Sequence, residues 1–78
     1  MPRTRSNDDL RVKFGQAVQW RRHELCVSQE KLAARAGIHR TYLGDIERGN
    51  RNPALVNICR IAAALGMRPS QLLQRMGM

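Results

Sequence analysis

Apolar residues recur every three or four positions along most of the chain, which is the period of a helix that buries one face. The pattern is clearest in QEKLAARAGIHRTYLGDIER, residues 29–48, which Gly37 divides into two helical segments. The first, Gln29–Ala36, is expected to take its N-cap from Ser28, and the second runs from about Arg40 to Arg48. The positions expected to be buried are Leu32, Ala36, Ile38, Leu43 and Ile46. The pattern therefore predicts two crossing helices with one exposed polar face, suited to recognising another molecule.

A preceding helix is predicted from Asp8 to about Leu25. Either Asp8 or Asp9 is expected to cap its N-terminus, where a carboxylate also suits the positive end of the helix dipole. Its buried face should carry Phe14, Val18 and Leu25. Trp20 lies off that face, and the pattern leaves open whether its ring is exposed or covers the rim of the core.

Turn residues introduce two further helices. Asn52 followed by Pro53 has the chemistry of a cap and a first helical residue, so a helix is predicted to start there. Its buried face should carry Leu55, Ile58, Ile61, Ala62 and Leu65. Pro69 opens a short last helix. No stretch alternates with the period of two that is typical of strands, so we expect an all-α fold of five helices.

The charge balance adds an anionic partner to this picture. Fourteen Lys and Arg residues stand against six Asp and Glu residues in 78, a formal charge of +8. We expect residues 8–78 to form one domain and residues 1–7 a flexible basic arm. Arg3 and Arg5 in that arm are either solvated or able to reach a DNA minor groove. A basic chain with a polar helix face indicates nucleic acid as the partner.

Composition also argues against several other classes of protein. Cys26, Cys59, His23 and His39 do not form a zinc-binding set, so neither a metal nor a cofactor is expected. A Cys26–His23 couple without a third orienting group is a weak case for an enzyme. The N-terminus lacks the apolar core of a signal peptide, and no run approaches the roughly 18 apolar residues that span a membrane. We expect a cytoplasmic protein, associated with the nucleoid and not with membranes.

The residues from Val27 to Gly66, VSQEKLAARAGIHRTYLGDIERGNRNPALVNICRIAAALG, resemble the helix-turn-helix domain of lambda-repressor/Cro-like proteins, the XRE family. The resemblance extends from about Leu10 to Leu73 and is carried by SQ-xx-LA-xxxG, IERG, NP-x-L and IAxALG. It implies a compact lambda-repressor-like domain with the helix-turn-helix in the second and third predicted helices. FGQ, RTY and ERGxRN are further similar to controller proteins of restriction–modification systems. Those are small dimeric regulators that bind palindromic operators and control their own gene and the nuclease gene.

This resemblance implies that the third predicted helix lies in the DNA major groove. The base-contacting residues would be Arg40, Thr41, Gly44 and Asp45, and the backbone-contacting residues would be Gln29, Tyr42, Arg48, Asn50, Arg51 and Asn52. Several alternatives stay open. Thr41 is either a base contact or a helix cap, and Tyr42 is either a DNA contact or a core aromatic. Gly44 either allows the helix backbone to come close to the DNA or is required by packing inside the protein. Asp45 either accepts a hydrogen bond from cytosine N4 or orients Arg48.

The resemblance also implies structural roles for residues away from the DNA. Arg22 and Glu47 are expected to form an ion pair that ties the first helix to the third. One helix-turn-helix covers only a half-site, so we expect a homodimer on double-stranded DNA. The interface is assigned to the apolar residues at and before the last helix, Met67, Leu72, Leu73 and Met76. The family commonly has glycine at the position of Cys26, so the end of the first helix is expected to differ here.

Four functional classes remain in competition at this point. The first is a transcriptional regulator, most similar to a controller protein that governs its own gene, and no small-molecule effector is expected. The second is an antitoxin, or a phage-type repressor, built on the same fold. The third is an enzyme, which the composition disfavours. The fourth is a binder of nucleic acid or membranes without sequence preference, and no stretch pairs a broad apolar face with a continuous basic face as membrane binding requires. We expect a DNA-binding regulator rather than an enzyme.

Overall fold

Five α-helices make up the part of the chain that the computed structural model describes, residues 7–77. They are α1 (Asn7–Glu24), α2 (Gln29–Ala36), α3 (Arg40–Glu47), α4 (Leu55–Ala64) and α5 (Pro69–Gln74), and these residues contain no strand. The predicted all-α fold of five helices is confirmed. Residues 1–6 and 78 lie outside the described part, and with them the predicted minor-groove contacts of Arg3 and Arg5.

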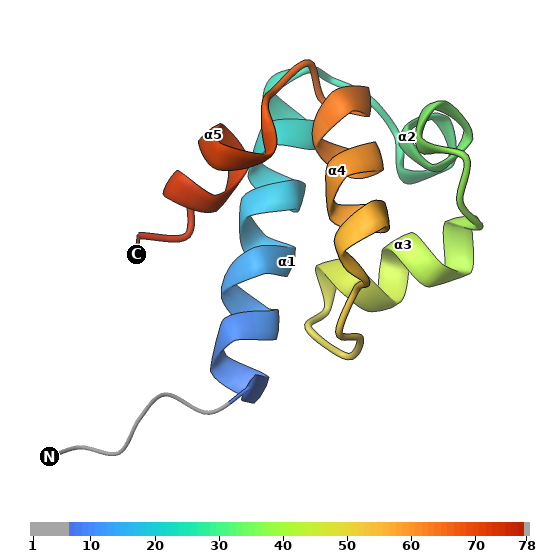
Figure 1. The fold of residues 1–78 in the computed structure, drawn as a ribbon. Coiled ribbons are helices and arrows are strands. Elements are labelled where there is room, and N and C mark those ends of the chain that lie inside the picture. Colours follow the sequence, from blue (N-terminus) through green and yellow to red (C-terminus); the bar gives the residue numbers. More distant parts are fainter. Residues whose placement is uncertain (1–6, 78) are drawn as a thin grey trace, which may run out of the picture.

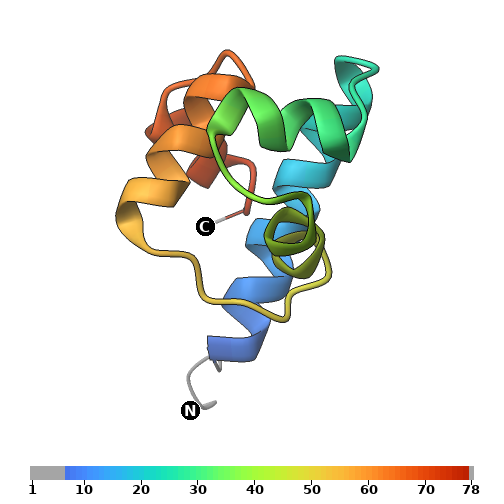
Figure 2. The same ribbon diagram turned by 90° about the vertical axis from the view of Figure 1, so that its right-hand side faces the viewer.

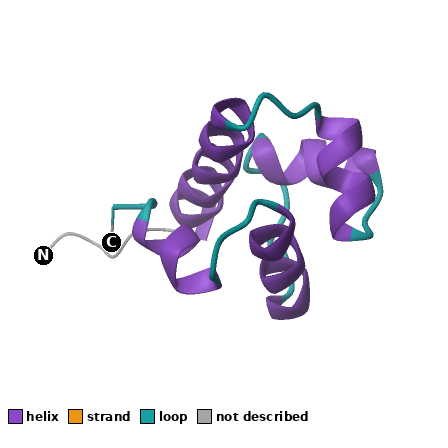
Figure 3. Cartoon of the chain, turned by 90° about the horizontal axis from the view of Figure 1, so that it is seen from above, coloured by secondary structure: helices purple, strands orange, loops and turns teal. Residues whose placement is uncertain are grey.

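The long helix α1 separates the helix-turn-helix from the last helix. On one side α3 packs against α1 and α2, while α2 also packs against α4. On the other side α5 packs against α1 and α4 (Figure 1). The view from above shows the same order, with the C-terminal end and α2–α3 at opposite ends of the molecule (Figure 3). The exposed side of α2 and α3 is therefore separated from the surface of α5.

All five helices contribute side chains to one core, which is aliphatic apart from Phe14. Its members are Phe14, Ala17, Val18, Leu32, Ala33, Ala36, Leu43, Ile46, Ile61, Ala62, Leu65 and Leu72. The predicted apolar positions of the helix-turn-helix are all buried except Ile38, which packs partly buried against this core. The helical period thus located the buried faces of α2 and α3 correctly.

The boundaries and exposed face of α1 differ from the prediction. The helix begins at Asn7, so Asp8 and Asp9 lie within its first turn rather than at its cap. Leu25 follows the last helical residue and is 37% exposed, because it lies beyond the turn that faces the core. Trp20, which the pattern left undecided, is 63% exposed.

The start of α4 also differs from the prediction. The helix begins at Leu55 with Ala54 as its N-cap, not with Asn52 and Pro53. Pro53 instead lies in the loop, where it lines a groove together with residues of α1 and α5. The delayed start leaves Leu55 beyond the edge of the core, where it is 75% exposed rather than buried.

A tight turn of the Schellman type ends α1. The N–H of Cys26 donates to the carbonyl of His23 at 3.0 Å, and the N–H of Val27 donates to that of Arg22 at 3.2 Å. The same pair of bonds ends α2, where Gly37 takes the left-handed conformation at φ 72°. At the end of α1 the corresponding residue is Cys26, with φ 56°. A cysteine therefore occupies a conformation that favours glycine.

Replacing Cys26 with glycine is expected to stabilise the fold. A residue with a Cβ pays about 1–2 kcal/mol in the left-handed region, and the greater unfolded-state entropy of glycine cancels only part of that gain. We expect a net gain of about 1 kcal/mol, or a rise of roughly 4–8 °C in melting temperature. Thermal unfolding followed by circular dichroism measures it. Cys26→Ala is the control, since it removes the thiol and keeps the strain; a glycine variant that melts no higher than this control would contradict the prediction.

A glycine in the middle of α1 brings this helix close to α3. A Cβ built on Gly15 would lie 2.3 Å from the carbonyl oxygen of Ile46 and 2.7 Å from that of Glu47. No other residue fits this distance, although glycine is a poor helix former. The close approach fixes the C-terminal end of α3 against α1 and brings Glu47 within reach of Arg22.

The last helix is anchored by one buried leucine and a set of ion pairs. Leu72 is 0% exposed, so its assignment to the dimer interface is wrong: it belongs to the core. Arg75 donates to Glu24 of α1 at 2.9 Å, and Arg21 donates to the same carboxylate at 3.3 Å. The Arg75 guanidinium, followed by that of Arg21, lowers the pKa of Glu24. Arg21 also donates from Nε to the carbonyl of Leu65 at the end of α4, at 3.2 Å.

Candidate nucleic-acid interface

The outward face of α3 is polar, as the sequence pattern predicts. Leu43 and Ile46 point into the core, whereas Arg40, Thr41 and Arg48 are exposed. Figure 2 looks onto this side of the molecule, with α2 and α3 towards the viewer.

The start of α3 leaves the side chains of its first turn available. Its N-cap is His39, whose side chain makes no capping bond. Thr41 is the second residue of the helix, so it is not the N-cap, and the structure excludes the capping role for this residue.

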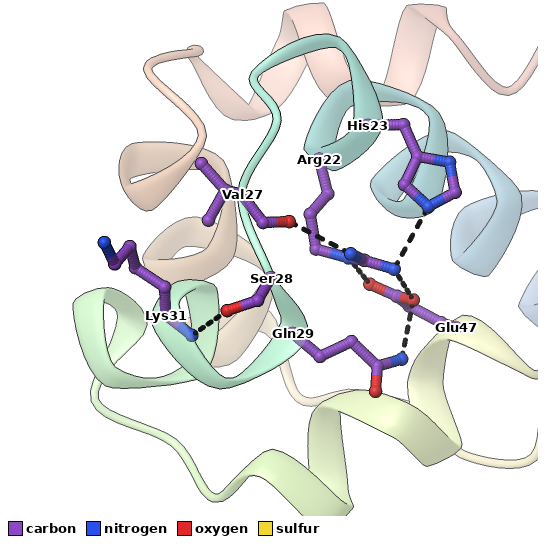
Figure 4. A network of polar contacts seen from close by, with 7 residues as sticks. All are labelled: Arg22, His23, Val27, Ser28, Gln29, Lys31 and Glu47. Carbon is purple, nitrogen blue, oxygen red and sulfur yellow. Dashed lines mark hydrogen bonds and ion pairs between the residues drawn. The ribbon is translucent and has the colours of Figure 1, made fainter.

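Beneath this face lies an ion pair that connects three segments of the chain. Arg22 donates from Nε to Glu47 Oε2 at 2.7 Å and from Nη2 to Oε1 at 2.9 Å, with the side chains only 10% and 1% exposed (Figure 4). Gln29 Nε2 donates to the same carboxylate at 2.9 Å, and Arg22 Nη1 donates to the carbonyl of Val27 at 3.0 Å. The pair implied by the resemblance is thus present, and it holds α1, α2 and α3 in fixed relation.

The N-terminus of α2 borders the first turn of α3. Ser28 caps α2 as predicted, its Oγ accepting from the N–H of Lys31 at 3.0 Å. A shallow hollow joins the two helices and is lined by Arg22, Ser28, Gln29, Glu30 and Arg40, so that two guanidinium groups outnumber the one carboxylate. The positive end of a helix and a guanidinium therefore face the same space, an arrangement that favours an anion. The predicted phosphate contact of Gln29 stays a prediction, since its amide also serves Glu47.

Tyr42 links α3 to α4 and to the loop between them. Its ring is partly buried against the core, and its hydroxyl accepts from Asn57 Nδ2 at 3.1 Å. The guanidinium of Arg51 lies over the ring, 5.0 Å from its centre. Sequence reasoning missed Asn57; the available signal was a single amide among the mostly apolar residues of α4. The ring of Tyr42 thus both packs against the core and carries an arginine.

Asp45 lies between two arginines on the exposed side of α3. Arg48 donates from Nη2 to Asp45 Oδ1, and Arg51 Nε lies 3.8 Å from Oδ2. Gly44 is buried, and the Arg48 guanidinium lies over it, 3.4 Å from where a Cβ would be. The predicted base contact of Gly44 stays a prediction and requires Arg48 to move aside. Asn50 and Asn52 lie exposed in the loop that follows.

Two findings limit the chemistry of the described residues. Residues 7–77 contain no group of three or more His, Cys, Asp and Glu side chains able to hold a metal ion. The helices in this part of the chain include none long and apolar enough to cross a membrane.

Comparison with known proteins identifies the same helix-turn-helix domain that the structure shows. A family model described as Helix-turn-helix matches residues 19–72. Control protein C.BamHI from Bacillus amyloliquefaciens is 51% identical over 67 residues, which are 85% of this chain and 83% of that protein. Control protein C.MunI from a Mycoplasma species is 39% identical over 66 residues, 83% of this chain and 89% of that protein.

The fold is shared with a solved controller protein. The crystal structure of the restriction-modification controller protein C.AhdI from Aeromonas hydrophila matches with a TM-score of 0.78 and 47% sequence identity. The match covers 80% of this chain and 94% of that one. The similarity thus extends over nearly the full length of that protein.

Proposed function

Because the chain belongs to the XRE-type helix-turn-helix family of DNA-binding transcription regulators, we propose that it is a restriction–modification controller protein that binds a palindromic operator as a homodimer. The observation that carries this proposal is the 51% identity to C.BamHI over most of both chains. The family and these relatives are regulators, so the prediction that the chain is not an enzyme is confirmed. A regulator of this kind works on the chromosome, in the cytoplasm and at the nucleoid.

In the proposed complex α3 enters the major groove with its first turn nearest the bases. Arg40 is exposed at that turn and has the geometry to donate two hydrogen bonds to guanine O6 and N7. Thr41 meets a thymine methyl group or a phosphate, and Gly44 allows the helix backbone to come close to the DNA. The contacts to the DNA backbone are assigned to Gln29, Tyr42, Arg48, Asn50, Arg51 and Asn52.

Replacing Arg40 with alanine should reduce sequence discrimination. One bidentate contact to guanine is worth about 1–3 kcal/mol, so the operator affinity is expected to fall roughly 5- to 150-fold. Affinity for a base-shuffled duplex should fall only about twofold to threefold, since it loses one phosphate attraction. Fluorescence anisotropy with both duplexes measures the two values. Arg60→Ala, an exposed arginine on α4, is the matched control; equal losses on both duplexes in the Arg40 variant would place this residue on the phosphates.

We assign the dimer interface to the apolar surface that remains after Leu72 is placed in the core. Leu73 on α5 is 43% exposed and borders a groove that continues to Met76 and Leu10. Leu55 and Val56 at the start of α4 are 75% and 55% exposed. Met67 and Met76 pack partly buried against the core and support this surface. Exposed aliphatic side chains of this kind gain from being covered by a second copy.

The regulatory proposal is tested with the DNA upstream of the protein's own gene. The expected result is binding to a duplex from that region at about 150 mM salt, with a base-shuffled duplex bound far more weakly. A reporter fused to the same region should respond to the protein's concentration without any added small molecule. Equal binding to both duplexes would reject sequence-specific control. Co-purification of a stoichiometric protein partner would instead favour an antitoxin.

A further inference from the structure

We propose that Asp45 restrains Arg48 and Arg51 and thereby weakens binding to DNA of the wrong sequence. The inference rests on the proposed function in one respect, namely that the exposed side of α3 is the side that meets DNA. Its basis is an ion-pair cluster of one carboxylate and two guanidinium groups on that side.

The carboxylate of Asp45 is engaged on both of its oxygens. Oδ1 accepts from Arg48, and Oδ2 lies 3.8 Å from Nε of Arg51. The Asp45 side chain is 27% exposed, whereas those of Arg48 and Arg51 are 61% and 54% exposed. A partly shielded acid thus holds two more exposed cations. Because both guanidinium groups lie against this carboxylate, the geometry favours a role for Asp45 in positioning the arginines over a role in reading a base.

Both arginines are also held against the protein surface. Arg51 lies over the ring of Tyr42, whose hydroxyl is in turn fixed by Asn57. Arg48 lies over Gly44, where it occupies the space next to the missing Cβ. The two guanidinium groups are therefore positioned along α3 before any DNA arrives.

This arrangement affects matched and unmatched DNA differently. Two free arginines on a chain of charge +8 would bind the phosphates of any sequence. Asp45 offsets part of that charge and repels phosphates that approach without the correct register. A DNA phosphate can replace Asp45 as the partner of an arginine only if it lies close to the position of the carboxylate. The phosphates of a closely docked operator meet this condition better than those of a non-specific complex. Discrimination can gain in this way from a group that disfavours the wrong ligand.

Glu47 does not share this role, although it lies only two residues further along α3. Its carboxylate is buried and accepts from Arg22 and Gln29, so it presents no charge to an approaching phosphate. Asp45 is therefore the residue whose neutralisation should change the charge of this face without disturbing the ion pair between α1 and α3.

The test is Asp45→Asn, which keeps the size and removes the charge. On a base-shuffled duplex at about 150 mM salt, we expect binding roughly tenfold tighter than wild type. Two released arginines should also steepen the plot of log K against log salt by up to about 2, at roughly 0.9 for each phosphate contact. Affinity for the upstream duplex should rise less, so the ratio of the two affinities falls. Unchanged binding to the shuffled duplex would overturn the inference, and so would a loss confined to the upstream duplex, because that loss would make Asp45 a base contact.

A second background separates restraint of the arginines from a simple change of net charge. In Arg48→Gln/Arg51→Gln protein, Asp45→Asn should change binding to the shuffled duplex by less than about twofold. If the tenfold gain persists there, net charge explains it and the inference fails. NMR relaxation of the arginine Nε groups in the DNA-free protein gives an independent readout. We expect Arg48 and Arg51 to become more mobile in Asp45→Asn, and unchanged order would contradict the restraint.

Failure of the proposed function has a different signature. If wild-type protein binds the upstream and shuffled duplexes equally, the sequence-specific regulator is rejected. The shuffled-duplex and NMR measurements still decide the role of Asp45, since neither uses an operator.

Discussion

Glu47→Ala is expected to lower the free energy of unfolding by about 3–5 kcal/mol, the cost of leaving one partner of a buried ion pair alone. The variant would leave Arg22 without the acceptor of its two shortest hydrogen bonds, in a site where its side chain is only 10% exposed. The amide of Gln29 would lose its acceptor as well. A domain of this size has little stability to spare, so we expect partial or complete unfolding at 37 °C. Urea denaturation followed by circular dichroism measures the loss.

Two variants test the cause of this loss. Glu24→Ala makes the same substitution in an exposed ion pair, that of Glu24 with Arg75. Its effect on the free energy of unfolding should be much smaller, because solvent screens that pair. Arg22→Met/Glu47→Leu removes both buried charges together and should restore much of the stability. If the unfolding curve of Glu47→Ala overlays the wild-type curve, the Arg22–Glu47 pair does not stabilise the packing of α1 against α3.

Leu73→Glu is expected to convert the protein to a monomer and to weaken operator binding by roughly 100-fold, since each half-site is then bound without the effective concentration supplied by its partner. The side chain is already 43% exposed, so the fold should tolerate the charge. Sedimentation velocity gives the assembly state, and anisotropy with the upstream duplex gives the affinity. Leu72 is unsuitable for this experiment, because a glutamate in its place would be buried in the core.

Gln71→Glu is the matched control for Leu73→Glu. It adds the same charge to the same helix, and glutamate retains the side-chain oxygen that accepts from the N–H of Arg68. We expect this control to remain dimeric and to bind the operator with only the small loss that its charge causes. A Leu73→Glu protein that sediments as a dimer would remove α5 from the interface.

The sequence predicted the helix-turn-helix well because its signals are local. Glycine at position 37, a serine cap at position 28 and a helical apolar period each act over one or two turns. In α5 these local signals do not determine which side chain is buried. Leu72 and Leu73 are adjacent and equally apolar, and they point about 100° apart on a helix of 3.6 residues per turn. Contacts with α1 and α4 decide which one is buried, and a six-residue helix is too short for periodicity to reveal it.

The candidate site was predictable to a similar degree. The position of Arg40 on an exposed first turn follows from the pattern of α3 alone. The pairing of Asp45 with Arg51 does not, since Arg51 lies in an irregular loop, where no periodic pattern places its side chains. The same loop delays the start of α4 and exposes Leu55. Residues whose role depends on an irregular loop were therefore the ones that sequence reasoning placed incompletely.

The central claim is that this chain reads a palindromic DNA sequence as a dimer. Selection of bound duplexes from a random DNA pool, at about 150 mM salt to weaken bare phosphate attraction, tests it most directly. We expect recovery of a palindrome whose half-sites are centred about 34 Å apart, one turn of B-DNA. Recovery of no common sequence, with binding that disappears as the salt concentration rises, would contradict it.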